Sequence, residues 1–247
     1  MKLYEHKPLV FLLFYLSFMI FSCQNLLSQI NPTLLNSLSA HFMREEFENN
    51  KLSITKGVIY FKTPNQVWIQ VNEPVIQNIK IDSDKMSIFY PINNKLFNFT
   101  SKSSFSLSFL TPFIASLESD YGLSKLKYQL NNYKFEKDTL TSSWYPHPKA
   151  DKRLGKVIVK TVSDKIIQVI KLDKSGKKKI EWITFEKYLI INDIFSFPEL
   201  ITIYKNSSEN QFSERIYLEE IKINHSIPNS ITNFTIPDNV IVEDFAW

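Results

Sequence analysis

The chain has 247 residues, which is enough for one large domain or two small ones with a sizeable core. It is 44% hydrophobic and 14% aromatic, with 20 Phe and only 4 Gly, so it is too aromatic for a disordered protein and lacks glycine-rich phosphate loops. The net charge of +4 comes with scattered lysines, and the composition therefore predicts no nucleic-acid partner.

The first residues, MKLYEHKPLVFLLFYLSFMIFSCQ, are organised like an export signal. Lys2 and Lys7 precede an apolar run over residues 9–21. This run is too short to cross a bilayer as a helix, but it suits the apolar part of a secretory signal. An uncleaved membrane anchor and a buried helix are the alternatives. We therefore predict that the protein is exported.

Cys23 is the only cysteine, so an intrachain disulfide is excluded. Ser22 supplies the small residue that a bacterial lipobox needs before its cysteine, although Phe21 fits the pattern poorly. Cleavage before Cys23 would make residues 1–22 the signal peptide and Cys23 a lipidation candidate. Ordinary cleavage at about residue 28 would remove Cys23 instead. Both possibilities stay open at this stage.

Two segments have the pattern of helices. Residues 30–50 offer Asn31 as a cap and Pro32 in the first turn, and residues 110–120 offer Thr111 and Pro112 in the same roles. Apolar residues recur on one stripe of each predicted helix. The stripes are Leu35, Leu38 and Phe42 in the first, and Phe113, Ile114 and Leu117 in the second.

Most of the remaining chain predicts strands. Polar or Pro-containing breaks separate short apolar runs, and Gly176 within DKSGKK is typical of a hairpin turn. Ten or so strands with two or three helices indicate a mainly β protein, a large antiparallel sheet or an open barrel, in one domain over residues 29–247. The predicted strands are residues 56–62, 67–71, 76–82, 86–91, 156–162, 165–173, 179–188, 199–205, 215–224 and 233–242.

Residues for catalysis or metal binding form no recognisable pattern. The histidines at positions 6, 41, 147 and 225 lack a metal-ligand spacing, and no local motif of a hydrolase or a redox enzyme occurs. The sequence therefore predicts no catalytic residue, no metal site and no cofactor. A secreted enzyme whose active site is assembled only in space remains an alternative.

Four segments resemble one known family in their order and spacing. They are GVIYFKTPNQVW, IKIDSDKMSIFYPINNKL, LTPF and SITNFTIPDNVIVEDF, and the family is the periplasmic outer-membrane lipoprotein carriers (LolA-like). The resemblance implies a half-open antiparallel β-barrel covered by a helical lid, around an apolar cavity for acyl chains. It implies a periplasmic chaperone whose partners are acylated lipoproteins, an inner-membrane lipoprotein exporter and an outer-membrane acceptor or membrane surface.

The chain departs from the family pattern at several positions. Thr63 occupies the place of the arginine that contacts the lid in the family, and Lys62 would point to the opposite face of its strand. Ser83-Asp84 replaces an Asp-Gly turn, and the region over residues 140–215 is longer than its equivalent. These departures leave the predicted fold intact but bear on how the lid is held closed.

Apolar residues occupy both faces of the strand over residues 56–62. Such a strand needs two apolar neighbours, which are a lid or ligand on one side and packed structure on the other; packing of both faces on helices is the alternative. Under the resemblance, both helical stripes named above become lid candidates. The cavity candidates are Tyr60, Trp68, Phe89, Ile167 and Val169.

A carrier must also release its cargo. Burial of one methylene is worth about 0.8 kcal/mol, so three full acyl chains would contribute roughly 30 kcal/mol or more, beyond the ceiling for non-covalent binding. The lid stripes are therefore expected to fill the empty cavity, so that cargo gains only the difference. A membrane-anchored acceptor or lipid sensor of the same fold, tethered through Cys23, is the alternative to a soluble carrier.

Overall fold

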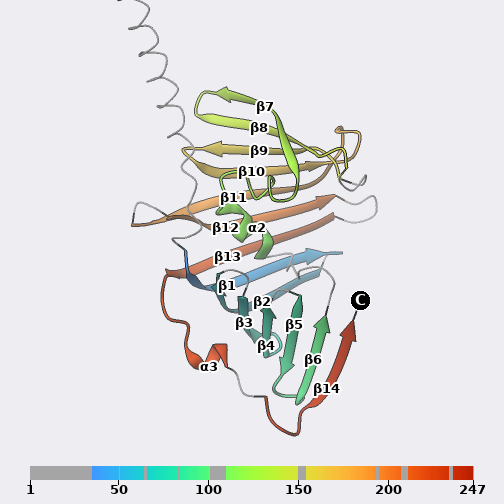
Figure 1. Ribbon diagram of the computed structural model, residues 1–247, viewed down its shortest axis with the longest axis vertical. Coiled ribbons are helices and arrows are strands. Elements are labelled where there is room, and N and C mark those ends of the chain that lie inside the picture. Colours follow the sequence, from blue (N-terminus) through green and yellow to red (C-terminus); the bar gives the residue numbers. More distant parts are fainter. Residues whose placement is uncertain are drawn as a thin grey trace, which may run out of the picture.

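The computed structural model describes residues 35–49, 51–63, 66–82, 84–100, 110–149, 154–192, 195–206, 211–233 and 236–246. Within these ranges, the strands join into one 14-stranded sheet (Figure 1). The elements are β1 (Ser37–Glu48), β2 (Lys51–Lys62), β3 (Gln66–Glu73), β4 (Gln77–Asp82), β5 (Lys85–Tyr90), β6 (Lys95–Thr100), α2 (Leu110–Ser116), β7 (Tyr128–Glu136), β8 (Thr139–Pro146), β9 (Val157–Val162), β10 (Lys165–Leu172), β11 (Lys179–Ile191), β12 (Phe195–Asn206), β13 (Gln211–Ile223), α3 (Asn229–Thr232) and β14 (Ile241–Ala246).

Two antiparallel meanders build this sheet. One runs from β1 to β6 and the other from β7 to β13, and the pairing of β1 with β13 joins them. The C-terminal strand β14 then returns to pair parallel with β6. In Figure 1 the strands of the second meander run across the view, whereas β4, β5, β6 and β14 run along it, which shows the twist of the sheet.

The sheet is not closed into a barrel. Its order begins at β14 and ends at β7, and these two edge strands do not pair with each other in the described part of the chain. The half-open barrel is therefore corrected to a large, twisted, open sheet. The β7–β8 hairpin forms one end of the sheet and β14 forms the other, and the two ends lie apart (Figure 1).

The helix predicted over residues 30–50 is wrong. Residues 37–48 form strand β1, which pairs with β2 on one side and β13 on the other. Leu38 and Phe42 are four residues apart, a spacing that fits one stripe of a helix but also one face of a strand. Ala40 lies between them on the same strand face and is equally buried, which is the alternation of a strand.

The second predicted helix is confirmed in α2, and most predicted strands are confirmed as well. Besides β1, three more strands were not predicted, namely β6, β7 and β8. The strand predicted over residues 233–242 is largely misplaced, because β14 begins only at Ile241 and residues 234 and 235 lie outside the described ranges. The hairpin turn at DKSGKK is confirmed, with Gly176 at φ +69°.

Directly paired residues on neighbouring strands project from the same face, so the pairing defines two faces. One face carries Ile69 and Phe197, and α2 packs on it; we call it the α2 face. The opposite face carries Trp68 beside α3, and we call it the α3 face. The main core lies on the α2 face, whereas Trp68, Phe89 and Leu96 are buried on the α3 face.

Candidate functional site

The α2 face is apolar across many adjacent strands. Val159, Val169, Ile183 and Ile203 pair in one row from β9 to β12, and none is more than 2% exposed. β-Branched side chains fit a pleated surface of this kind because they pack closely against their cross-strand neighbours. The row therefore forms a dry, continuous floor beneath whatever lies on this face.

Helix α2 lies on this floor (Figure 1). Phe113 is fully buried, and its ring centroid lies 6.2 Å from that of Phe197 on β12. Ile114 and Leu117 are half-buried against the same core. A seven-residue helix is marginal on its own, so these apolar contacts rather than helix propensity hold α2 in place.

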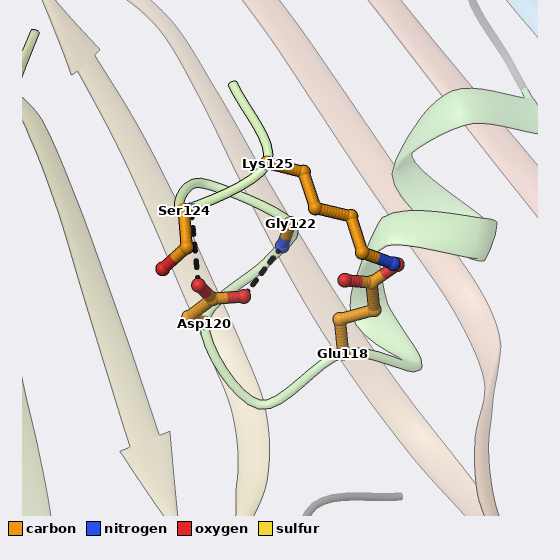
Figure 2. Close-up of polar contacts among 5 residues, drawn as sticks. All are labelled: Glu118, Asp120, Gly122, Ser124 and Lys125. Carbon is orange, nitrogen blue, oxygen red and sulfur yellow. Dashed lines mark hydrogen bonds and ion pairs between the residues drawn. The ribbon is translucent and has the colours of Figure 1, made fainter. Parts of the chain in front are cut away.

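The segment after α2 is a loop held in place by hydrogen bonds and an ion pair between its own residues (Figure 2). The two carboxylate oxygens of Asp120 accept hydrogen bonds from the backbone N–H groups of Gly122 and Ser124, each at 3.0 Å. Lys125 Nζ lies 2.6 Å from Glu118 Oε1. Gly122 has φ +68°, a conformation that costs a glycine little, so the loop can turn tightly over the sheet.

This loop directs two more apolar side chains onto the α2 face. Tyr121 and Leu123 are buried, and the Tyr121 ring lies 6.0 Å from that of Phe185. Burial, with the negative charge of Glu181 nearby, raises the pKa of the Tyr121 hydroxyl, so this group stays neutral. Helix α2 and its loop, residues 110–127, thus form one structured layer that we call the cover.

The apolar surface of the α2 face continues past the cover onto β7 and β8. Trp144 and Tyr128 at the near end of this hairpin still pack against the core. Further along, four large apolar side chains on the same face are exposed to solvent by 38% to 69%. We call these residues the β7–β8 stripe: Leu130, Tyr133, Phe135 and Leu140.

Aromatic side chains also gather at the opposite end of the α2 face. Phe245 on β14 stacks at 5.2 Å on Phe99 and at 6.3 Å on Phe97, both from β6. Tyr90 meets Phe97 edge to face at 5.7 Å. Phe245 is 42% exposed, so this cluster is an open aromatic surface. Both ends of the α2 face therefore present apolar side chains to solvent.

One charged cluster interrupts the apolar face. Glu214 on β13 is 1% exposed, and its Oε1 lies 2.5 Å from Arg44 Nε on β1. Arg44 Nη1 also lies 2.8 Å from Glu46 Oε2. Glu214 Oε2 is buried and has no hydrogen-bond partner among the described residues. A buried carboxylate of this kind depends on its arginine partner.

The α3 face holds a pocket of about 630 Å³ between β2–β4 and the chain around α3. We call it the α3 pocket. Most of the residues that line it have polar side chains, in contrast with the α2 face. The residues that line it are Asn36, Ser37, Lys62, Gln66, Trp68, Lys80, Asn224, His225, Ser226, Ile227, Asn229, Thr232 and Asn233.

No group of His, Cys, Asp and Glu side chains among the described residues is arranged to hold a metal ion. No helix in the described ranges has the length and apolar character needed to cross a membrane.

Comparison of the sequence with protein-family models and with curated proteins gave no match. Comparison of the fold with solved structures gave several matches. A domain described as an outer membrane lipoprotein-sorting protein from Vibrio parahaemolyticus is similar at TM-score 0.54 and 11% identity, covering 81% of this chain and 90% of that one. A LolA superfamily protein from Nitrosomonas europaea is similar at TM-score 0.55 and 12% identity, covering 80% and 90%. A DUF1329 family protein from Desulfovibrio piger gives TM-score 0.54 at 9% identity, covering 81% and 90%.

The fold is LolA-like. This agrees with the family resemblance seen in the sequence. At these identities the likeness establishes the architecture alone, and the chemistry of the LolA-like sheet must come from its own residues.

The structure separates the predicted cavity residues instead of bringing them together. Tyr60, Trp68 and Phe89 project from the α3 face, whereas Val169 lies on the α2 face. Ile167 sits half-buried at a register shift between β10 and β9. Only Val169 among the five therefore lies in the floor beneath the cover.

The predicted lid residues also divide into two groups. Phe113, Ile114 and Leu117 belong to α2 and its loop, and they pack against the core as a cover would. Leu38 and Phe42 belong to the floor, on β1, and Leu35 is buried just before that strand. These three residues are not part of a helical lid. Cys23 and the predicted signal peptide lie outside the described residues.

Sequence reasoning missed the β7–β8 stripe. The pairing of β7 with β8 shifts register between Leu130 and Asn132, which breaks the alternation of apolar and polar residues. Beyond the shift, Tyr133 and Phe135 do alternate with polar neighbours. That short alternation was the only local signal of an amphipathic strand.

Proposed function

We propose that this protein is a carrier that binds the acyl chains of lipoproteins and moves them from the inner to the outer membrane. The LolA-like fold supports a lipoprotein-binding role, since two similar structures are described as a lipoprotein-sorting domain and a LolA superfamily protein. The role assigned to each residue rests on the geometry of the α2 face. No catalytic residue is assigned.

The observation that carries the proposal is the apolar face that extends from beneath the cover onto the exposed β7–β8 stripe. Tyr133 and Phe135 are 69% and 67% exposed, on the same face as the buried floor. Exposed apolar surface that continues from a core is typical of a binding groove or a membrane contact. An acyl chain along this path would bury the stripe and reach the edge of the cover.

The cover gives the carrier a way to release its cargo. Its side chains Phe113, Ile114 and Leu117 already pack against the floor. An acyl chain that displaces them gains only the difference between its own burial and theirs. At about 0.8 kcal/mol per methylene, this exchange keeps the affinity of even a multiply acylated cargo within a reversible range.

The first test measures acyl binding by the stripe. A fluorescent fatty-acid probe and a synthetic diacylated lipopeptide are titrated into the purified protein and into Tyr133→Ser/Phe135→Ser. Removal of two large apolar contacts should weaken binding by at least about tenfold. The matched control Asn132→Ser/Lys134→Ser changes the opposite face of the same strand and should leave the affinity unchanged.

The outcomes are distinct. Equal affinities in both double variants, or no binding of either probe by the parent protein, would contradict the proposal. Carrier activity is then measured as the transfer of an acylated lipoprotein from inner-membrane vesicles to outer-membrane vesicles. Acyl binding without such transfer would favour the alternative role, in which the protein is an acceptor or sensor of the same fold.

The alternative role rests on Cys23, which follows a loose lipobox. A diacylated Cys23 would anchor the protein and make it an acceptor rather than a soluble carrier. Mass spectrometry of the mature N-terminus separates the two roles. A mature chain that begins at a lipidated Cys23 supports the acceptor, and one that begins near residue 29 supports the periplasmic carrier.

A further inference from the structure

The α3 pocket lies on the side of the sheet opposite the proposed acyl-binding face. Its floor is formed by Gln66, Trp68 and Lys80, which project from the α3 face, and its other wall comes from the chain around α3. A volume of about 630 Å³ is within the range of small-molecule sites in proteins. The pocket is therefore a separate site from the carrier function proposed above.

The charge of the lining is positive. Lys62 and Lys80 both line the pocket, and no Asp or Glu is found among the described residues that line it. Some other lysines pair with carboxylates, as Lys56 does with Glu73 at 3.0 Å and Lys171 with Glu181 at 2.5 Å. Within the described ranges, Lys62 and Lys80 form no such ion pair. Their ammonium groups thus remain available to an anion.

The placement of these two lysines suits one compact anionic group. Lys62 pairs with Gln66, and Gln66 pairs with Asp82, which is two residues beyond Lys80 on β4. The two lysines are therefore two strands apart, roughly 10 Å across the sheet. Flexible four-carbon stems let both ammonium groups reach a group between them. Asp82 is already engaged, since it accepts a hydrogen bond from Gln66 Nε2 at 3.4 Å.

One wall of the pocket is held rigidly by hydrogen bonds. Asn224 Oδ1 accepts from the backbone N–H of Asn36 at 2.8 Å, and Ser37 Oγ donates to the carbonyl of His225 at 2.6 Å. The backbone N–H of Asn224 donates in turn to the carbonyl of Ser37 at 2.8 Å. A pocket with a fixed wall loses little entropy when a ligand binds.

Two amide side chains also line the same space. Asn229 and Asn233 line the pocket from α3 and its C-terminal cap, and amide groups donate to phosphate or carboxylate oxygens. Trp68 is 4% exposed, and its indole Nε1 has no hydrogen-bond partner in the described part of the chain. A buried donor without a partner is uncommon in native proteins and calls for an explanation.

We propose that the α3 pocket binds a phosphate group carried by a small polar molecule. Lys62 and Lys80 supply the counter-charge, and the amides of Asn229 and Asn233 bind further oxygens. Two lysines act as point charges on a phosphate, and the pocket has room for the rest of a phosphate ester. Both a soluble phosphate ester and the headgroup of a phospholipid carry this chemistry.

The test titrates the purified protein with inorganic phosphate and with sn-glycerol 3-phosphate by calorimetry. Sedimentation with vesicles of phosphatidylglycerol in phosphatidylcholine is measured in parallel. Lys62→Gln/Lys80→Gln should weaken glycerol phosphate binding by at least about tenfold, because hydrogen bonds to charged groups are lost. The control Lys51→Gln/Lys85→Gln removes the same charge from exposed sites outside the pocket and should bind as the parent does.

A second variant keeps the test valid if the lysine double variant does not fold. Asn233→Asp places a negative charge in the lining at an exposed position, and it should weaken glycerol phosphate binding by a similar factor. Circular dichroism confirms the fold of each variant. Loss of glycerol phosphate binding in the pocket variants, together with unchanged binding in the control variant, supports the site.

The remaining outcomes overturn the site or identify the source of the phosphate. The proposed site is overturned if neither soluble probe binds at millimolar concentration. It is also overturned if the pocket double variant and the control double variant lose binding to the same extent. When the soluble probes bind, vesicle binding that is lost only in the pocket variants assigns the phospholipid headgroup. Vesicle binding that the pocket variants leave unchanged assigns a soluble phosphate ester. Neither result depends on acyl binding at the α2 face.

Discussion

The most exacting prediction concerns the buried ion pair on the α2 face. Glu214 is 1% exposed, and its carboxylate lies 2.5 Å from Arg44 Nε. The change Arg44→Met keeps an unbranched side chain of similar length but removes the guanidinium. Glu214 would then be a buried carboxylate that has lost its ion-pair partner, in a face made of apolar side chains.

The expected loss of stability in Arg44→Met follows from the burial of Glu214. Breaking a buried pair by removing one partner costs about 3–5 kcal/mol, since the remaining charge is uncompensated. Glu214→Gln should cost less, because a neutral amide replaces the charge and Glu46 still lies 2.8 Å from Arg44 Nη1. The double change Arg44→Met/Glu214→Leu removes both charges and should recover most of the stability lost in Arg44→Met.

The assay is urea denaturation followed by tryptophan fluorescence and circular dichroism, with the free energy of unfolding as the readout. Arg215→Met is the matched control, since Arg215 is an exposed arginine on β13 next to Glu214. It should change stability by less than about 0.5 kcal/mol. Equal effects of Arg44→Met and Arg215→Met, or a double variant no more stable than Arg44→Met, would refute this reasoning.

Three further predictions test the fold and the cover. Gly57→Ala should destabilise the protein by about 1–3 kcal/mol or more in urea denaturation, because a Cβ at this position would lie 2.0 Å from the carbonyl oxygen of Gln70; an unchanged midpoint would contradict the register of β2 and β3. Hydrogen bonds from Ser175 and the Lys178 backbone lower the pKa of Asp173 below its ordinary value of 3.8. Its ionised form therefore stabilises the turn above that pH, and the stability difference from Asp173→Asn should shrink as the pH falls through the folded pKa; a difference that is independent of pH would count against it. Ile114→Ala on the cover should strengthen retention of a bound acyl probe, as measured by its dissociation rate, and an unchanged rate would show that the cover does not compete with cargo.

The secondary structure of much of the chain could be predicted from short-range sequence patterns. Strands β2 to β5 and β9 to β13 were predicted because their apolar runs are separated by clear turn residues. Helix α2 was predicted because Pro112 and an apolar stripe mark it within a few residues. The hairpin at Gly176 was predicted for the same reason. Each of these features depends on neighbours in sequence.

The candidate site was predicted less well. The identity of apolar residues is visible in the sequence, but the face from which each one projects depends on register. Trp68 and Val169 were expected in one cavity, yet they lie on opposite faces of the sheet. The β7–β8 stripe was missed because a register shift hides its alternation.

The amino-acid sequence by itself determined that the protein is mainly β, with a short helix within residues 110–120 and a resemblance to lipoprotein carriers. Only the tertiary structure decided that residues 37–48 form a strand, that the sheet stays open, and that a pocket lined largely by polar residues lies on the face opposite the apolar one. The physical reason is the distance along the chain between partners. Arg44 and Glu214 meet across β1 and β13 although 170 residues separate them, and no local pattern encodes such a pairing.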